Sequence, residues 1–238
     1  MKLKASLFIA LLLLGLSVSA GEKDLDRQLL LATANNDLGA VQMTLMAGAD
    51  ANAVSAYGTT PLMMAVEDGN IVAAALLISY GADVNRQSTS GTTAITAAAE
   101  YGHTEILAIL LERGANLHSR TREGWNALMI AADQGQFDMV DQLIFKGVDP
   151  EVADRRGHTA LMMAAAKGHV NVIKLLLEKG KANPDARDRS GATALVLAAE
   201  AGKPLAVNEL LAGGAKDEDN LAKTVQFMPA KSEKSKAN

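Results

Sequence analysis

The sequence predicts an all-α solenoid of six stacked helix-turn-helix units joined by β-turn or hairpin connections. Three observations predict it: glycines that recur about every 33 residues, a second glycine series that closes each unit, and a polar capping residue before each apolar segment. Such a period is typical of repeat proteins, in which each unit buries its apolar faces against its neighbours. The chain has 238 residues, of which 49% are apolar, enough for one sizeable packed domain.

The first segment in chain order is a predicted secretory signal over residues 1–20. Lys2 and Lys4 precede an apolar stretch at 7–16, and the small residues V-S-A at 18–20 suit a signal peptidase. The apolar stretch is about half of the roughly 20 residues needed to span a bilayer, which argues against a membrane anchor. No cysteine follows it, which excludes a lipid-modified N-terminus. We therefore expect cleavage after Ala20, export, and no stable membrane insertion.

The charge balance and the absence of cysteine exclude further classes of function. Without Lys2 and Lys4 the chain has 21 basic and 27 acidic residues, a net charge of −6. General nucleic-acid binding needs a positive field, so we expect no nucleic-acid partner. With no cysteine there is neither a disulfide framework nor thiol chemistry.

The glycines divide the rest of the chain. Five units open at Gly58, Gly91, Gly124, Gly157 and Gly191, and four close at Gly81, Gly114, Gly147 and Gly180. A shift back by one period finds an earlier copy at about 25–57, which lacks the opening glycine. After the signal, the predicted segments are an N-terminal capping repeat at 21–57, repeats at 58–90, 91–123, 124–156 and 157–190, a C-terminal capping repeat at 191–215, and a flexible tail at 216–238.

Each unit contains the signals for two short helices. The predicted N-caps of the first helices are Thr60, Thr93, Asn126, Thr159 and Thr193. Pro61 follows its cap at the first helical position, and a mid-unit glycine ends each first helix. The fifth unit is one residue longer than the fourth, and we place the extra residue at 181–184, where the turn should bulge.

These motifs resemble the ankyrin repeat family, whose units open with T-P-L-H-x-A. The closest matches are TPLMMA at 60–65 and TALMMA at 159–164, and the resemblance covers about residues 25–215. The histidine of the motif, which ties neighbouring units in the family, is replaced by Met63, Thr96, Met129, Met162 and Val196. We expect apolar packing to take over that role, since methionine at helical spacing indicates a core rather than a metal or cofactor site.

No motif indicates catalysis, a cofactor or a metal. His103 and His169 occupy glycine-histidine turns, so we expect structural roles for them. His118 and His158 lie in different units, with no carboxylate pair at metal-ligand spacing. H-E-x-x-H, glycine-rich phosphate-loop and G-x-S-x-G motifs are all absent from the sequence.

The resemblance implies a concave partner-binding side formed by turn tips and the exposed flanks of the first helices. Three of the four Tyr and Trp residues fall there, and rigid aromatics beside arginine are typical of binding hot spots. The charged candidates are acidic early and basic late, which would orient a partner, although simple solvation explains the charges equally well. Carried over by position, the partner-binding candidates are Tyr57, Glu67, Asp68, Glu100, Tyr101, Arg122, Glu123, Trp125, Asp133, Arg155, Arg156, His158, Lys167 and Arg189. Phe145 is either exposed on the second helix or fills a local gap.

We therefore expect a non-catalytic protein-protein interaction module in the periplasm of a Gram-negative bacterium, monomeric when free. It would inhibit or protect another exported protein, for example a cell-wall enzyme. The alternatives are an accessory of a periplasmic oxidative-stress enzyme, a secreted effector acting on a host protein, and a small-ligand binder or enzyme at His158. The last needs a polar pocket of which the sequence gives no sign.

Overall fold

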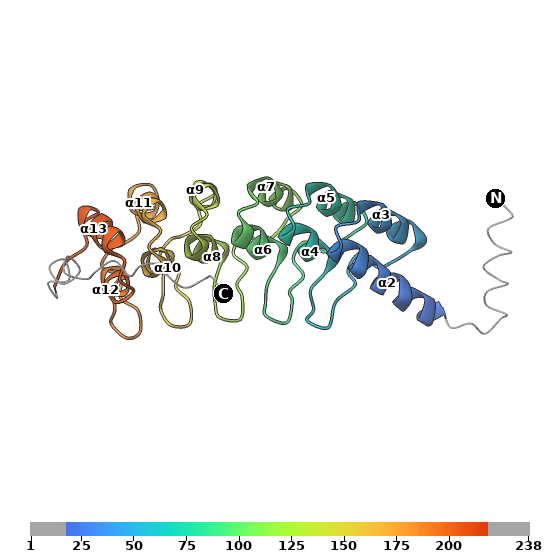
Figure 1. Cartoon of the computed structure of the whole chain (residues 1–238), viewed down its shortest axis with the longest axis horizontal. Helices are drawn as coiled ribbons and strands as arrows, with labels where there is room; N and C mark the ends of the chain where they lie inside the picture. Colours follow the sequence, from blue (N-terminus) through green and yellow to red (C-terminus); the bar gives the residue numbers. More distant parts are fainter. Residues whose placement is uncertain (1–17, 219–238) are drawn as a thin grey trace, which may run out of the picture. The chain divides into compact units, whose positions relative to one another are not determined.

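A computed structural model describes the backbone of residues 18–218 and the side chains of residues 23–218, and every regular element in this range is an α-helix (Figure 1). The chain divides into two compact parts, residues 1–89 and 90–238, and helical repeats build the described portion of each. The predicted all-α repeat class is thus confirmed. Most of the predicted signal, and the chain after residue 218, lie outside the described residues. No described helix combines the length and apolar character needed to cross a membrane.

The first part contains two repeats. Its helices are α2 (Val18–Ala34), α3 (Leu38–Ala47), α4 (Pro61–Glu67) and α5 (Ile71–Ser79). The first helices α2 and α4 pack together, as do the second helices α3 and α5. Helix α2 spans the predicted cleavage point after Ala20, but its buried Leu29 lies downstream of that point. Cleavage there would leave this buried contact in place.

The second part contains four repeats arranged as two rows of helices (Figure 1). The first helices are α6 (Ala94–Tyr101), α8 (Ala127–Gln134), α10 (Ala160–Lys167) and α12 (Ala194–Glu200), each packed against the next. The second helices are α7 (Thr104–Glu112), α9 (Phe137–Phe145), α11 (Val170–Glu178) and α13 (Pro204–Ala212). The core lies between the rows, where α8 and α10 each bury six consecutive residues.

All five predicted N-caps are confirmed: each side-chain oxygen accepts a hydrogen bond from the backbone N–H three residues later. At the position of the missing motif histidine, Met63, Met129 and Met162 are buried, as expected of core residues. Thr96 differs, because its Oγ1 accepts a hydrogen bond of 2.8 Å from the Thr93 backbone N–H. Met162 is buried and also makes this contact, since its Sδ accepts a hydrogen bond of 3.5 Å from the Thr159 backbone N–H. Apolar packing thus replaces the histidine at Met63 and Met129, whereas Thr96 and Met162 also contact the backbone of their N-cap residues.

The connections between repeats are tight turns that end on the opening glycines. Consecutive turns are joined by a backbone hydrogen bond, for example from Arg189 N–H to the Arg156 carbonyl at 2.9 Å. The opening glycine of each such turn is required for two reasons: its φ is positive, and the backbone of the next turn lies close to it. A Cβ on Gly157 would lie 2.9 Å from the backbone nitrogen of Arg189, while a Cβ on Gly191 would meet no described atom within 4 Å.

The extra residue of the fifth repeat lies at the end of α11 and not in the turn that follows. Gly81, Gly114 and Gly147 have positive φ, but in the fifth repeat Lys181 takes that conformation, with φ 57°, in place of Gly180. The Ala182 N–H bonds to the carbonyl of Leu176, six residues back, whereas the matching bond of the preceding repeat spans five residues. Helix α11 has nine residues, as α9 has in the preceding repeat, so the extra residue lies between the helix end at Glu178 and Lys181.

The described chain continues past the last repeat to Glu218. The Lys216 N–H donates to Asp185 at 2.9 Å, and Arg187 pairs with Glu218 at 2.6 Å. The Lys216 hydrogen bond is the main reason that the pKa of Asp185 lies below its usual value. The first three residues of the predicted flexible tail thus have defined contacts.

Candidate functional site

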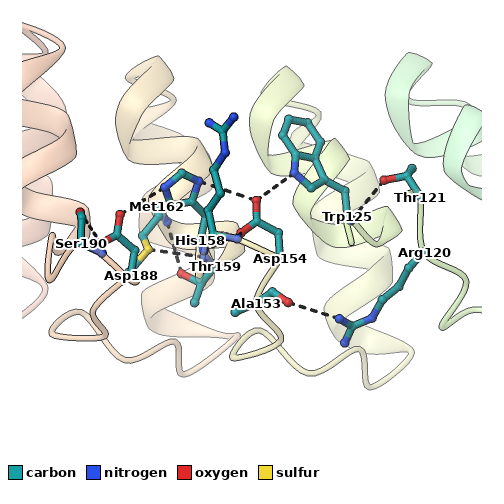
Figure 2. Close-up of polar contacts among 11 residues, drawn as sticks. Arg120, Thr121, Trp125, Ala153, Asp154, His158, Thr159, Met162, Asp188 and Ser190 are labelled. Atoms are coloured by element: carbon teal, nitrogen blue, oxygen red, sulfur yellow. Dashed lines mark hydrogen bonds and ion pairs between the residues drawn. The ribbon is translucent and has the colours of Figure 1, made fainter. Parts of the chain in front are cut away.

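Trp125 lies immediately after the turn at 121–124 and is only partly buried. Its Nε1–H donates a hydrogen bond of 3.0 Å to Oδ2 of Asp154, from the next turn (Figure 2). The indole N–H thus fixes the ring against the neighbouring repeat.

Asp154 and Asp188 hold the turns together, and the sequence analysis did not select either of them. Oδ1 of Asp154 accepts hydrogen bonds of 2.8 Å from the N–H groups of Arg156 and His158. Oδ1 of Asp188 accepts from the Ser190 N–H and hydroxyl and from the Ala192 N–H. The signal for both was an aspartate three residues before an opening glycine, a common turn-forming position.

The environment of Asp188 favours its ionised form. Burial is the largest single influence and raises the pKa of Asp188, but it is outweighed by other contacts. The hydrogen bonds from Ser190 and Ala192, together with the nearby His158, bring the pKa of Asp188 below its ordinary value.

His158 lies between these two carboxylates (Figure 2). Its Nε2 is 3.2 Å from Oδ2 of Asp188, and its Nδ1 is 3.7 Å from Oδ2 of Asp154. Trp125, Asp154, His158 and Asp188 therefore form a continuous polar chain across three consecutive turns, which we call the tip chain. The sequence spacing gave no sign of these two contacts, because Asp188 comes from a different turn, 30 residues further along the sequence.

Two open hollows flank Trp125. One, of about 230 Å³, is lined by Thr92, Thr96, Glu100, Thr121, Glu123, Trp125, Ile130 and Gln134. The other, of about 310 Å³, is lined by Arg122, Glu123, Trp125, Asp154, Arg155, Arg156 and His158, and we call it the arginine hollow. It is the kind of polar pocket near His158 that the sequence analysis did not find.

The structure brings some of the predicted residues together and separates others. Six of them line the arginine hollow, and Glu100 shares the other hollow with Trp125. Asp133 and Lys167 contact each other at 3.6 Å. Arg189 is exposed on the turn at 188–191.

The remaining aromatic and acidic candidates lie elsewhere. Tyr101 stacks on His103, with ring centroids 6.2 Å apart. Tyr57, at 76% exposure, belongs to the first part of the chain together with Glu67 and Asp68. Phe145 does not fill a gap, since 85% of it is exposed on α9.

His169 has the structural role expected of it. Its Nε2 lies 2.8 Å from the carbonyl oxygen of Asp133 near the end of α8, and its ring covers Gly135. Gln136 occupies the same position one repeat earlier and donates to the Glu100 carbonyl at 3.2 Å. These side chains tie the ends of neighbouring first helices together.

The tip chain does not have the arrangement of a hydrolytic triad. In a triad the histidine contacts the nucleophile, and the carboxylate orients the histidine. Here the Ser190 hydroxyl donates to Asp188 at 2.7 Å, so the carboxylate lies between the hydroxyl and the imidazole. Among the described residues, no group of three or more His, Cys, Asp or Glu could hold a metal ion.

A comparison with known families gives one match. The family model described as ankyrin repeats (3 copies) matches residues 29–121, 75–154 and 128–220. Together these segments cover the repeats of both parts. No curated protein matches the sequence.

Proposed function

This chain belongs to the ankyrin-repeat family, and on that basis we propose that it is a non-catalytic interaction module that binds another exported protein. The observation that carries the proposal is the setting of Trp125. The ring is held by Asp154, stays partly exposed, and borders a hollow on either side. A rigid aromatic beside arginine in a concave setting is typical of binding hot spots, because little conformational entropy is lost when a partner covers it.

We further propose that the protein works in the periplasm and modulates its partner by inhibiting or protecting it. The support for export is the composition of residues 1–20, with its two lysines, apolar stretch and small residues before the predicted cut. Fractionation of cells that express the full chain, with mass measurement of the product, tests this. A protein that stays in the cytoplasm with residues 1–20 intact would overturn the export proposal.

The binding proposal is tested by capture and then by reconstitution. The full chain with an affinity tag serves as bait in a periplasmic extract, and mass spectrometry identifies what it retains. The identity of the partner then separates a cell-wall enzyme from an oxidative-stress enzyme. Activity of the purified partner, measured with and without the protein, shows whether binding inhibits or protects.

Three variants, each measured against the purified partner, then locate the binding surface. Trp125→Ala should weaken binding by more than about 2 kcal/mol, roughly 30-fold, as truncation of a hot spot does. Phe145→Ala removes a large exposed aromatic from α9, away from the turns, and should leave binding unchanged. Trp125→Phe keeps an aromatic ring, smaller than indole, and removes the hydrogen bond to Asp154, so comparison with Trp125→Ala separates loss of the ring from loss of its anchoring. If only Phe145→Ala weakened binding, the partner would lie on the second helices and the proposed surface would be wrong.

A further inference from the structure

We infer that the arginine hollow binds carboxylate side chains of an acidic segment of the partner protein. This inference rests on the proposed function and adds the chemistry of the partner. It follows from three observations: the arginines around the hollow are unpaired within the described residues, few carboxylates there are accessible, and the Trp125 ring forms an apolar wall.

Among the described residues, the cations around the hollow have no acidic partner. Arg122, Arg155 and Arg156 are exposed, and within residues 23–218 none of their guanidinium groups forms an ion pair or a hydrogen bond. Other basic side chains do have partners: Lys179 pairs with Asp141 at 2.7 Å, and Arg187 with Glu218. These unpaired arginines thus lie on two consecutive turns, and Arg189 adds a further positive charge on the turn after them.

The acidic groups at the hollow leave few accessible acceptors for these arginines. The Asp154 side chain is only 3% exposed, and both its oxygens already accept hydrogen bonds, from Trp125 and from two backbone N–H groups. Glu123 is the exposed carboxylate of the lining. Three guanidinium groups therefore face one accessible carboxylate, and the hollow favours an anionic ligand.

A peptide carboxylate suits this site better than an isolated ion. Guanidinium groups bind carboxylates through paired, charge-assisted hydrogen bonds. The Trp125 ring forms an apolar wall against which the methylene groups of a glutamate side chain can pack. Since the cations follow the turns from 121 to 189, an extended segment with several acidic residues would meet more than one of them.

The single tryptophan provides the measurement. The full chain is titrated with hexaglutamate in 50 mM NaCl, and Trp125 fluorescence and calorimetry are recorded. We expect saturable binding with a change in tryptophan emission, and no binding of hexaglutamine. Raising the salt to about 300 mM should weaken binding severalfold, because exposed charges are screened.

A matched pair of variants tests the location. Arg155→Gln should weaken hexaglutamate binding about threefold to fivefold, as expected for loss of one exposed ion pair. Arg113→Gln removes the same charge from an exposed site after α7, outside the lining, and should change affinity by less than about 1.5-fold. Arg122→Gln combined with Arg155→Gln should weaken binding at least tenfold. Thermal unfolding of each variant confirms that the fold is retained.

Three results would overturn the inference. The first is no saturable binding of hexaglutamate in either measurement. The second is equal weakening by Arg113→Gln and Arg155→Gln, which would indicate general attraction by net charge. The third is binding of inorganic phosphate as tightly as hexaglutamate and with the same loss in Arg155→Gln, which would make the hollow a site for small anions. Each leaves the proposed function standing if Trp125→Ala still weakens the natural partner.

Discussion

Replacing Gly157 by alanine tests how closely the turns are packed, with Gly191→Ala as its matched control. Both glycines have nearly the same backbone conformation, with φ of 87° and 88°. Alanine in this region costs about 1 kcal/mol in either place, after the lower entropy of the unfolded chain is allowed for. The two sites differ only in what a new Cβ meets: the backbone of the turn at 188–191 in one case, open space in the other.

The steric part of the effect follows from the contact distances. At Gly157 the Cβ would lie 2.9 Å from the nitrogen of Arg189 and 3.1 Å from Cα of Asp188, so the neighbouring turn must move as a whole. That movement breaks the hydrogen bond from Arg189 to Arg156, about 1 kcal/mol, and disturbs packing at a further cost of about 1–2 kcal/mol. We expect Gly157→Ala to lower the free energy of unfolding by about 3–4 kcal/mol, against about 1 kcal/mol for Gly191→Ala.

Urea unfolding measures both variants, followed by circular dichroism and by Trp125 fluorescence. Agreement of the two signals shows whether a single free energy describes the transition. If both variants were destabilised equally, to within about 0.5 kcal/mol, the stacked turns would tolerate a methyl group. The packing argument for the opening glycines would then be wrong.

Three further predictions concern single side chains. Lys181→Gly should raise the free energy of unfolding by about 0.5–1 kcal/mol, because glycine adopts the left-handed conformation of this position without strain, and this gain exceeds the added entropy of the unfolded chain. A lower free energy of unfolding, measured with urea, would contradict this. The lowered pKa of Asp188 means that its ionised form stabilises the fold above the unfolded value of about 3.9 and that this gain is lost as the pH falls through the folded value. The difference in free energy of unfolding between the native protein and Asp188→Asn should therefore become smaller below pH ~4. A difference that does not change with pH would refute the lowered pKa of Asp188. His169→Ala should lower the free energy of unfolding by about 1–2 kcal/mol. His169→Gln should recover at least half of that loss, since Gln136 makes the equivalent contact one repeat earlier. Equal losses for the two variants in thermal unfolding would show that the hydrogen bond to Asp133 contributes little to stability.

The sequence predicted best what depends on local chemistry. The caps from Thr60 to Thr193 and the glycine turns follow from neighbouring residues alone, so their positions were correct except at Gly180, where Lys181 takes the positive φ. Contacts between turns were harder to predict from the sequence, because residues about 30 positions apart meet only after the repeats stack. The bond of Trp125 to Asp154 and the position of His158 between two carboxylates had no local signal, and the role of Trp125 in partner binding stays a prediction.

The extra residue of the fifth repeat shows another kind of limit. Spacing between glycines reveals that one residue has been added, but not which flanking element takes it up. Lys181 adopts a conformation that a glycine would adopt more easily, and this depends on how far α11 winds before it ends. That balance between helix and turn is settled by packing over several residues and not by the identity of any one of them.

The open surface above Gly191 bears on how long such an array can become. The backbone of the next turn packs directly on Gly157, whereas among the described residues nothing lies within 4 Å of a Cβ built on Gly191. If a copy of the preceding repeat were added after the last one, its turn could pack on Gly191 as the turn at 188–191 packs on Gly157. Lengthening the array by duplication then requires no change in the repeats already present, and each added copy would bring a new set of turn residues for recognition.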